Sequence, residues 1–86
     1  GKERIVQGKV VDSYRTEKGT VFLNLGRPYP EQCFTAVIFS SYGKNFVSNP
    51  EDYYLNKIVR VRGRIKEYRG KPEIILKSPN QIEPGK

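Results

Sequence analysis

Lys57 to Leu76 reads K-I-V-R-V-R-G-R-I-K-E-Y-R-G-K-P-E-I-I-L and carries the clearest structural signal in the sequence. Its first half alternates apolar or small residues with cations: Val59, Val61, Gly63 and Ile65 against Arg60, Arg62, Arg64 and Lys66. A period of two with β-branched residues on one phase predicts an antiparallel strand with its apolar side facing a core. Glu67 to Lys71 interrupts this pattern with glycine and charge, and Pro72 begins a second apolar run. The stretch therefore predicts a β-hairpin.

The tip of this predicted hairpin carries Tyr68, Arg69 and Lys71. Seven Lys or Arg residues stand against one Glu between Lys57 and Lys71. Cations on strands also protect small sheets from aggregation. The arginines on the first strand of this hairpin are therefore either simply solvated or part of a binding surface. An aromatic ring among cations favours a nucleic-acid surface, because rings stack on bases while cations contact phosphates.

Three earlier segments alternate in the same way, and we expect strands over Ile5–Tyr14, Thr20–Leu25 and Phe34–Phe39. Gly8 lies on the inward phase of the first, where glycine allows a sharp bend. Arg15 to Gly19 predicts a charged hairpin loop. The predicted core comprises Val6, Val10, Val21, Leu23, Leu25, Phe34, Ala36, Ile38, Val59, Val61, Ile65 and Ile74, with Ile82 as a last contact.

One short helix is expected before Lys57. Asn49 is a good N-cap, Pro50 suits the first helical position, and two acids follow in the first turn. Its core contacts are expected to come from Phe46, Tyr53, Tyr54 and Leu55.

Composition limits the function. The 86 residues form one domain with a core over about residues 5–82, either a whole protein or a piece of a larger one. A net charge of +7 and a pI near 9.7 favour a polyanionic partner, nucleic acid before an anionic membrane. No apolar run approaches a membrane span, and no long amphipathic helix is visible, so we expect no membrane partner.

Catalysis and metal binding lack the residues that they need. The chain has one cysteine, Cys33, and no histidine, which excludes an intrachain disulfide, Cys/His catalysis and an ordinary zinc site. The carboxylates show no spacing that pairs two of them for acid–base work. We therefore expect no enzyme activity, no cofactor and no metal, unless a parent chain carries a catalytic domain elsewhere.

The order of elements is three strands, a short helix and two strands. This order predicts an all-β fold, the five-stranded Greek-key OB-fold barrel with one short helix between strands three and four. The sequence resembles the OB-fold family of nucleic-acid-binding domains typified by the anticodon-binding domains of class II aminoacyl-tRNA synthetases. The resemblance rests on V-x-G-x-V at residues 6–10, G-T-V-F-L-N-L at 19–25 and V-x-V-x-G-x-I-x-x-Y-x-G-x-P-E-I at 59–74.

The resemblance implies that Phe22 stacks on a base and that Thr35 contacts base edges. It is closest to bacterial members, which implies a bacterial cytoplasmic protein. Leu25-Gly26-Arg27 stands where the synthetases have L-R-D, so general single-strand binding is favoured over anticodon reading.

The expected function is non-catalytic binding of single-stranded nucleic acid, DNA ahead of RNA, across strands two and three and the flanking loops. The alternatives are a protein-docking domain, with Phe22 as its anchor, and a tRNA-binding accessory domain of an enzyme. Stacking on bases is expected from the aromatic residues Phe22, Tyr14 and Tyr68. Phosphate contacts are expected from the cations Lys9, Arg15, Lys18, Arg69 and Lys71. Contacts with base edges are expected from the polar residues Asn24 and Thr35.

Overall fold

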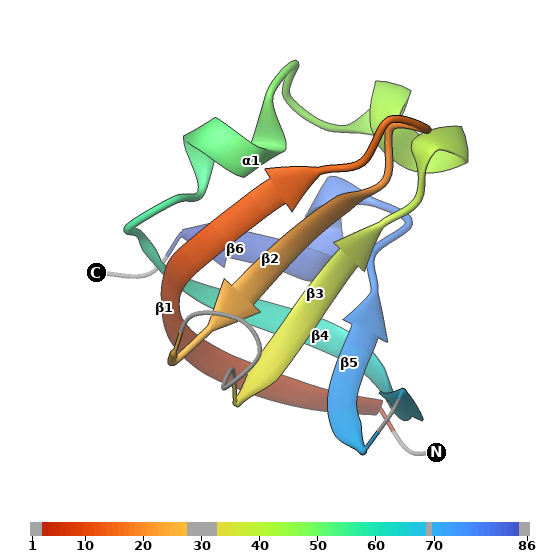
Figure 1. The fold of residues 1–86 in the computed structure, drawn as a ribbon. Helices are drawn as coiled ribbons and strands as arrows, with labels where there is room; N and C mark the ends of the chain where they lie inside the picture. Colours follow the sequence, from red (N-terminus) through yellow and green to blue (C-terminus); the bar gives the residue numbers. More distant parts are fainter. Residues whose placement is uncertain (1–2, 28–32, 69, 85–86) are drawn as a thin grey trace.

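The structure is a computed structural model that describes residues 3–27, 33–68 and 70–84, without the side chain of Tyr68. Strands make up most of it (Figure 1). In chain order the elements are β1 (Glu3–Arg15), β2 (Val21–Leu25), β3 (Phe34–Ile38), the 3-10 helix η1 (Ser40–Asn45), α1 (Pro50–Tyr53), β4 (Ile58–Tyr68), β5 (Lys71–Ile75), the 3-10 helix η2 (Pro79–Gln81) and β6 (Ile82–Pro84).

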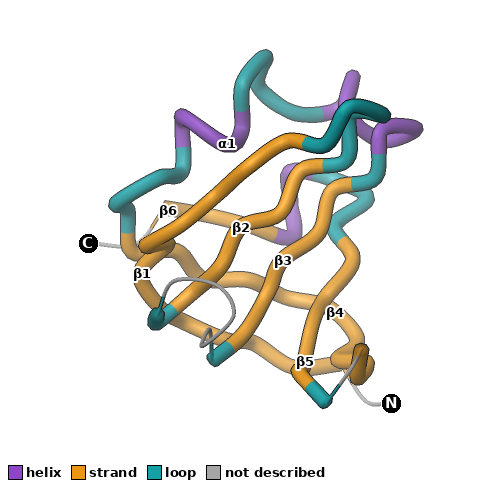
Figure 2. The backbone as a smooth tube through the Cα atoms, in the orientation of Figure 1, coloured by secondary structure: helices purple, strands orange, loops and turns teal. Residues whose placement is uncertain are grey.

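Five strands close into a barrel in the order β1-β2-β3-β5-β4, with β4 pairing back onto β1. The pairs are antiparallel except for β3 and β5, which run parallel. The short strand β6 adds to β4 outside this circuit. Figure 2 shows the backbone of the strands curving around to form the barrel. The predicted all-β, five-stranded OB-fold barrel is confirmed.

Strand β1 pairs with two different strands along its length. Glu3 to Lys9 pairs with β4, and Val10 to Arg15 pairs with β2. The strand curves strongly between its two halves (Figure 1). Gly8, where the sequence predicts a bend, is the second-last residue of the half that pairs with β4. A side chain at this glycine would contact Leu25 of β2, whose Cδ2 lies 3.4 Å from the position of an added Cβ.

The core agrees closely with the sequence prediction. Ten of the twelve predicted strand positions are buried, and Val6 and Ile65 are half-buried against them. Ile82 is buried as expected, whereas Leu76, which has no exposed surface, was not among the predicted core residues. Apolar burial at roughly 25 cal/mol per Å² is the main force that holds such a barrel together.

Two short helical segments, rather than one, lie between β3 and β4. Helix α1 begins at Pro50 behind Asn49 as predicted, although the Asn49 side chain makes no capping hydrogen bond. Tyr54 is buried, and Phe46 and Leu55 pack against the core. The predicted core role of Tyr53 is wrong. Its side chain is 43% exposed, and the Lys57 ammonium lies 4.7 Å from its ring centroid.

Gly63 allows β4 to pass directly over β5. A Cβ at this position would lie 2.7 Å from Cγ2 of Ile74, which is fully buried, and 3.0 Å from Nε2 of Gln81. That amide nitrogen already donates to the carbonyl oxygens of Arg62 and Ile75. A methyl group would therefore displace a core side chain and a hydrogen-bonded amide together.

Gly63→Ala is expected to lower the free energy of unfolding by roughly 1–3 kcal/mol, the usual cost of overpacking. Gly43→Ala is the matched control, because nothing lies within 4 Å of a Cβ added there. Its effect should stay within about 0.5 kcal/mol, as for most surface changes. Urea denaturation of both variants measures this. Equal stability of the two would contradict the close approach of β4 and β5.

Candidate functional site

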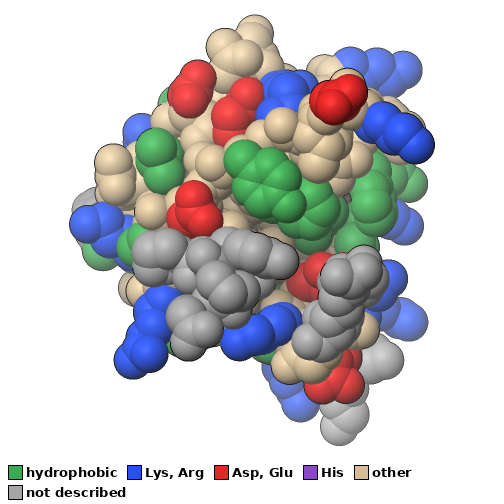
Figure 3. Space-filling view, in the orientation of Figure 1, with side chains coloured by type: hydrophobic (Ala, Val, Ile, Leu, Met, Phe, Trp, Pro, Cys, Tyr) green, Lys and Arg blue, Asp and Glu red, His purple; other side chains and the backbone are tan. Residues whose placement is uncertain are grey.

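An apolar row crosses the outer face of the barrel. Tyr14, Phe22, Val37 and Ile75 are successive cross-strand partners on β1, β2, β3 and β5. The rings of Tyr14 and Phe22 are stacked, with centroids 5.1 Å apart and planes inclined by 19°. Tyr14 is 45% exposed, Phe22 is half-buried and Val37 is buried. Figure 3 shows a hydrophobic patch on this face, with Lys and Arg side chains around its margins.

The outward orientation of Tyr14 depends on an irregularity in β1. The phase of Val6, Gly8 and Val10 would carry Tyr14 into the core. A register shift between Val10 and Asp12 inverts the alternation, so that Val10 pairs with inward Leu25 while Tyr14 pairs with Phe22. Such β-bulges are common beside functional sites, where they redirect a side chain. The consecutive valines at 10 and 11, followed by an aspartate on the inward phase, are the sequence signal for this shift.

A polar row runs beside the apolar row, two residues along each strand. It consists of successive partners on β1, β2, β3, β5 and β4: Asp12, Asn24, Thr35, Glu73 and Lys66. The Asn24 amide donates to Oδ2 of Asp12 at 3.3 Å, and the Thr35 hydroxyl donates to Oδ1 of Asn24 at 3.0 Å. Hydrogen bonds of this kind keep buried polar groups satisfied.

Asn24 and Thr35 are expected from the sequence to read base edges, but the structure buries both. Their side chains are 1% and 4% exposed, respectively, and they bond to each other. Their polar atoms are committed within the sheet. We therefore leave both residues out of the set assigned to a ligand.

The predicted cations lie in different places. Lys18 is exposed in the β1–β2 turn, and Lys71 is half-buried at the start of β5. These two turns lie at opposite ends of the face formed by β2, β3 and β5 (Figure 1). Lys9 is exposed on the half of β1 that pairs with β4, opposite Ile58. The Tyr68 side chain and Arg69, also predicted at the site, lie outside the described residues.

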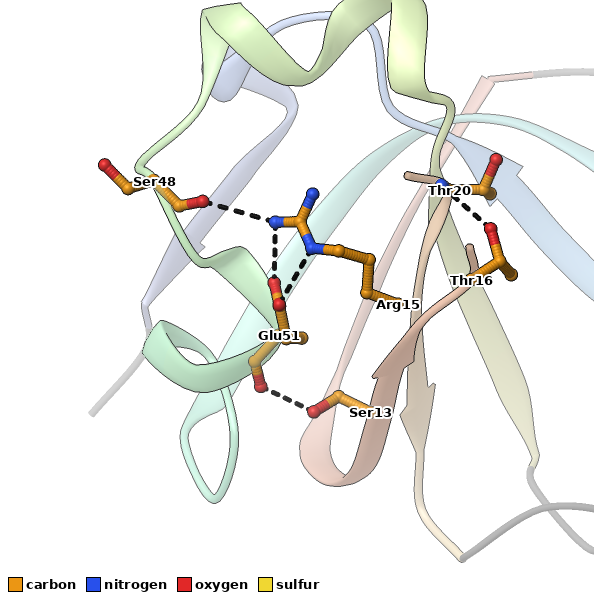
Figure 4. A network of polar contacts seen from close by, with 6 residues as sticks. All are labelled: Ser13, Arg15, Thr16, Thr20, Ser48 and Glu51. Atoms are coloured by element: carbon orange, nitrogen blue, oxygen red, sulfur yellow. Dashed lines mark hydrogen bonds and ion pairs between the residues drawn. The ribbon is translucent and has the colours of Figure 1, made fainter. Parts of the chain in front are cut away.

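Arg15 holds the segment before β4 against β1 (Figure 4). Its Nε and Nη2 donate to the two carboxylate oxygens of Glu51 at 2.9 and 3.0 Å, and Nη2 also donates to the Ser48 carbonyl. The Ser13 hydroxyl donates to the Glu51 carbonyl at 2.5 Å. The hydrogen bond with Arg15 lowers the pKa of Glu51 and raises the pKa of Arg15. Arg15, expected to be a phosphate ligand, is thus occupied by an internal ion pair.

A second surface lies on the β1–β4–β6 side. The outward arginines of β4 are exposed, and a groove of about 200 Å³ is lined by Ile5, Arg60, Arg62, Asn80, Gln81 and Glu83. Ile5 is 63% exposed, the most of the large hydrophobic side chains in the described part of the chain. Arg60 lies 3.6 Å from the Glu83 carboxylate and donates to Gln7, so part of its charge is already compensated.

Other kinds of site find little support in the part of the chain that the structure describes. There, no three His, Cys, Asp or Glu side chains form a group that could hold a metal ion. Cys33 is an exposed free thiol. None of the helices described is long and apolar enough to span a membrane.

Glu51→Gln is expected to destabilise the protein at pH 7 by less than about 1 kcal/mol, because solvent reaches and screens the 38%-exposed Arg15 side chain. Since folding lowers the pKa of Glu51 from its ordinary value of about 4.5, the stabilisation is present above that pH. It is lost as the pH falls through the lower pKa of the folded state.

Thermal unfolding from pH 7 down to pH 3 measures the difference between Glu51→Gln and the wild-type protein. Glu17→Gln, an exposed residue in the β1–β2 turn, controls for the change in net charge. A difference that stays constant down to pH 3 would contradict a titrating ion pair.

No protein-family model matches the sequence, and no curated protein matches it. The resemblance to OB-fold nucleic-acid-binding domains therefore stays a prediction. The site is interpreted from the geometry and chemistry of the chain itself.

Proposed function

We propose that this domain binds single-stranded nucleic acid, without catalysis, on the outer face of β2 and β3. The observation that carries the proposal is the stacked pair Tyr14–Phe22, which lies on the outer face of the barrel in a protein with a net charge of +7. Aromatic side chains on such a face offer stacking surfaces for bases, each worth roughly 1–3 kcal/mol.

The arrangement of the pair suits an unpaired strand. Its two rings stack on each other, so each ring uses one face in the pair and keeps one face for a base. Phe22 also lies beside the buried side chain of Val37 on β3. Every base has a flat π-face, and a surface of this kind accepts any of them when the bases are not already paired. Single-stranded DNA is the first ligand to test, and RNA of the same sequence is the second.

Cations at the two ends of the face supply the electrostatic part of binding. Lys18 marks one end and Lys71 the other, with Lys66 at the end of the polar row on β4. A strand that crosses the face would meet cations on both sides of the stacking surface. Counterion release from its phosphates would make the affinity depend on salt.

The second candidate function is docking of another protein or domain. The groove beside Ile5 favours it, because an exposed aliphatic side chain among arginines is typical of protein-binding surfaces. That groove is on the β1–β4–β6 side, so this candidate no longer needs Phe22 as its anchor. The tRNA-binding accessory role remains a special case of the first proposal.

Tyr14→Ala and Phe22→Ala should each weaken binding of fluorescein-labelled oligo-dT by roughly 1–3 kcal/mol, with little change in the salt dependence. Phe22 is half-buried, so its removal should also cost stability, including about 0.5–1.5 kcal/mol for the lost ring pair. Circular dichroism verifies that each variant is folded. Tyr53→Ala, which removes an exposed ring from α1, is the matched control. If both variants bind at wild-type strength, the proposed site is contradicted and the arginines of β4 become the candidate surface. Arg62→Ala would then test that surface.

Lys18→Ala and Lys71→Ala should act through charge. Each lost phosphate contact should reduce the slope of log affinity against log salt concentration by about 0.7 for a single strand. Arg4→Ala removes an exposed cation from the half of β1 that pairs with β4 and should leave the slope unchanged. Anisotropy titrations at four salt concentrations give the slopes. Identical slopes for all three variants would exclude phosphate contacts at the two turns.

A further inference from the structure

Glu73 is a buried carboxylate without a hydrogen-bond partner in the part of the chain that the structure describes. It lies on β5 in the polar row, between Thr35 of β3 and Lys66 of β4, and only 9% of its surface is exposed. Among the described residues, no hydrogen bond or ion pair involves its side chain, whereas its neighbour Thr35 donates a hydrogen bond to Asn24 on β2.

This burial is unfavourable unless something compensates it. Removing a carboxylate from water without a hydrogen-bond donor costs free energy, and folded proteins rarely leave such a group unsatisfied. The lack of solvation raises the pKa of Glu73, and only the charge of Lys66 opposes this rise. Buried, unpartnered ionisable groups beside a binding surface are candidates for a functional role.

The position of Glu73 suits contact with a stacked base. It lies two strands from Phe22, about 10 Å across the sheet, and one row away, about 7 Å along the strands. Val37 lies between these two positions on the outer face, and its buried side chain gives the gap an apolar floor. A base that rests on Phe22 and extends over Val37 would direct its polar edge toward Glu73.

We propose that Glu73 makes this face select guanine, an inference that rests on the proposed single-strand binding. An ionised carboxylate only accepts hydrogen bonds and can accept two in parallel. The exposed Watson–Crick edge of guanine carries two adjacent donors, N1–H and the N2 amino group. Adenine and cytosine place a ring-nitrogen acceptor beside their amino group, and thymine and uracil place an acceptor on each side of N3–H.

Neighbouring groups strengthen this selectivity. The hydrogen-bonding atoms of Asn24 and the hydroxyl of Thr35 are used within the row, so they do not offer a compensating donor to an acceptor edge. A base that turns an acceptor toward Glu73 would place two hydrogen-bond acceptors against each other without a proton between them. Such a contact is unfavourable at low dielectric. Selection would therefore combine attraction for guanine with rejection of the other bases.

The test uses fluorescein-labelled ten-nucleotide oligo-dT carrying one central dG, dA, dC or deoxyinosine. The dG oligonucleotide should bind the wild-type protein about 5- to 150-fold more tightly than oligo-dT, the range expected for a good bidentate contact. Deoxyinosine, which lacks the N2 amino group, should fall between them. Glu73→Gln should bind oligo-dT at least as well as wild type and lose the preference for dG. Glu67→Gln, an exposed glutamate on β4, should keep it.

The outcomes separate the two proposals. Binding of all five oligonucleotides with equal affinity, or a preference for dC or dA, would overturn the role of Glu73 and leave single-strand binding intact. A dG preference that survives in Glu73→Gln would overturn it as well. Binding of none of them would overturn the proposed function and this inference together. The inosine comparison uses only wild-type protein, so a dG oligonucleotide that binds no more tightly than its deoxyinosine counterpart would overturn the paired contact even if a variant fails to fold.

Discussion

The whole barrel depends on one strand that pairs with two neighbours. Strand β1 joins β4 through its first half and β2 through its second, and without this double pairing the sheet would stay open between β4 and β1. Closure removes exposed strand edges, which is the physical reason why small sheets form barrels. The bend near Gly8 and the register shift after Val10 are what allow one chain segment to serve both partners.

The same register shift connects the fold to the candidate site. It turns Tyr14 outward onto Phe22 and aligns Asp12 with Asn24, so both rows of the outer face depend on it. The face therefore combines an apolar row suited to stacking with a polar row that is mostly satisfied internally. Glu73 is the exception, because its carboxylate is buried without a partner among the described residues. Stacking alone accepts any base, whereas a carboxylate that only accepts hydrogen bonds can discriminate between them.

Much of the fold was predictable because period-two patterns report directly on which side of a strand is buried. Val59 and Val61, for instance, alternate with arginines that face water, and both valines are fully buried. What escaped prediction depends on contacts between distant parts of the chain. The pairing of Arg15 with Glu51 joins residues 36 positions apart, so no local pattern shows that this arginine is occupied.

The polar row also depends on contacts between strands that the sequence does not show. Asn24 and Thr35 look like surface residues from their phase, but each also has a polar neighbour on the next strand, and the mutual hydrogen bond makes burial tolerable. Glu73 follows a proline in an apolar run, and only the parallel pairing of β3 with β5 places it beside Thr35. Stacking residues were easier to identify, because an aromatic residue on the polar phase of a strand is visible in the sequence itself.

The pairing of β1 with β4 also has a consequence for how the chain reaches its native state. Residues 3–9 pair with residues 58–64, so β1 can complete its pairing only after β4 has been synthesised. Contacts between such distant segments carry a large loop-closure entropy and slow folding. Until then β1 and β3 each keep a free edge that is available to other chains. The cations on the outer phase of β4 and the charged β1–β2 turn would keep such partly formed barrels apart through mutual repulsion.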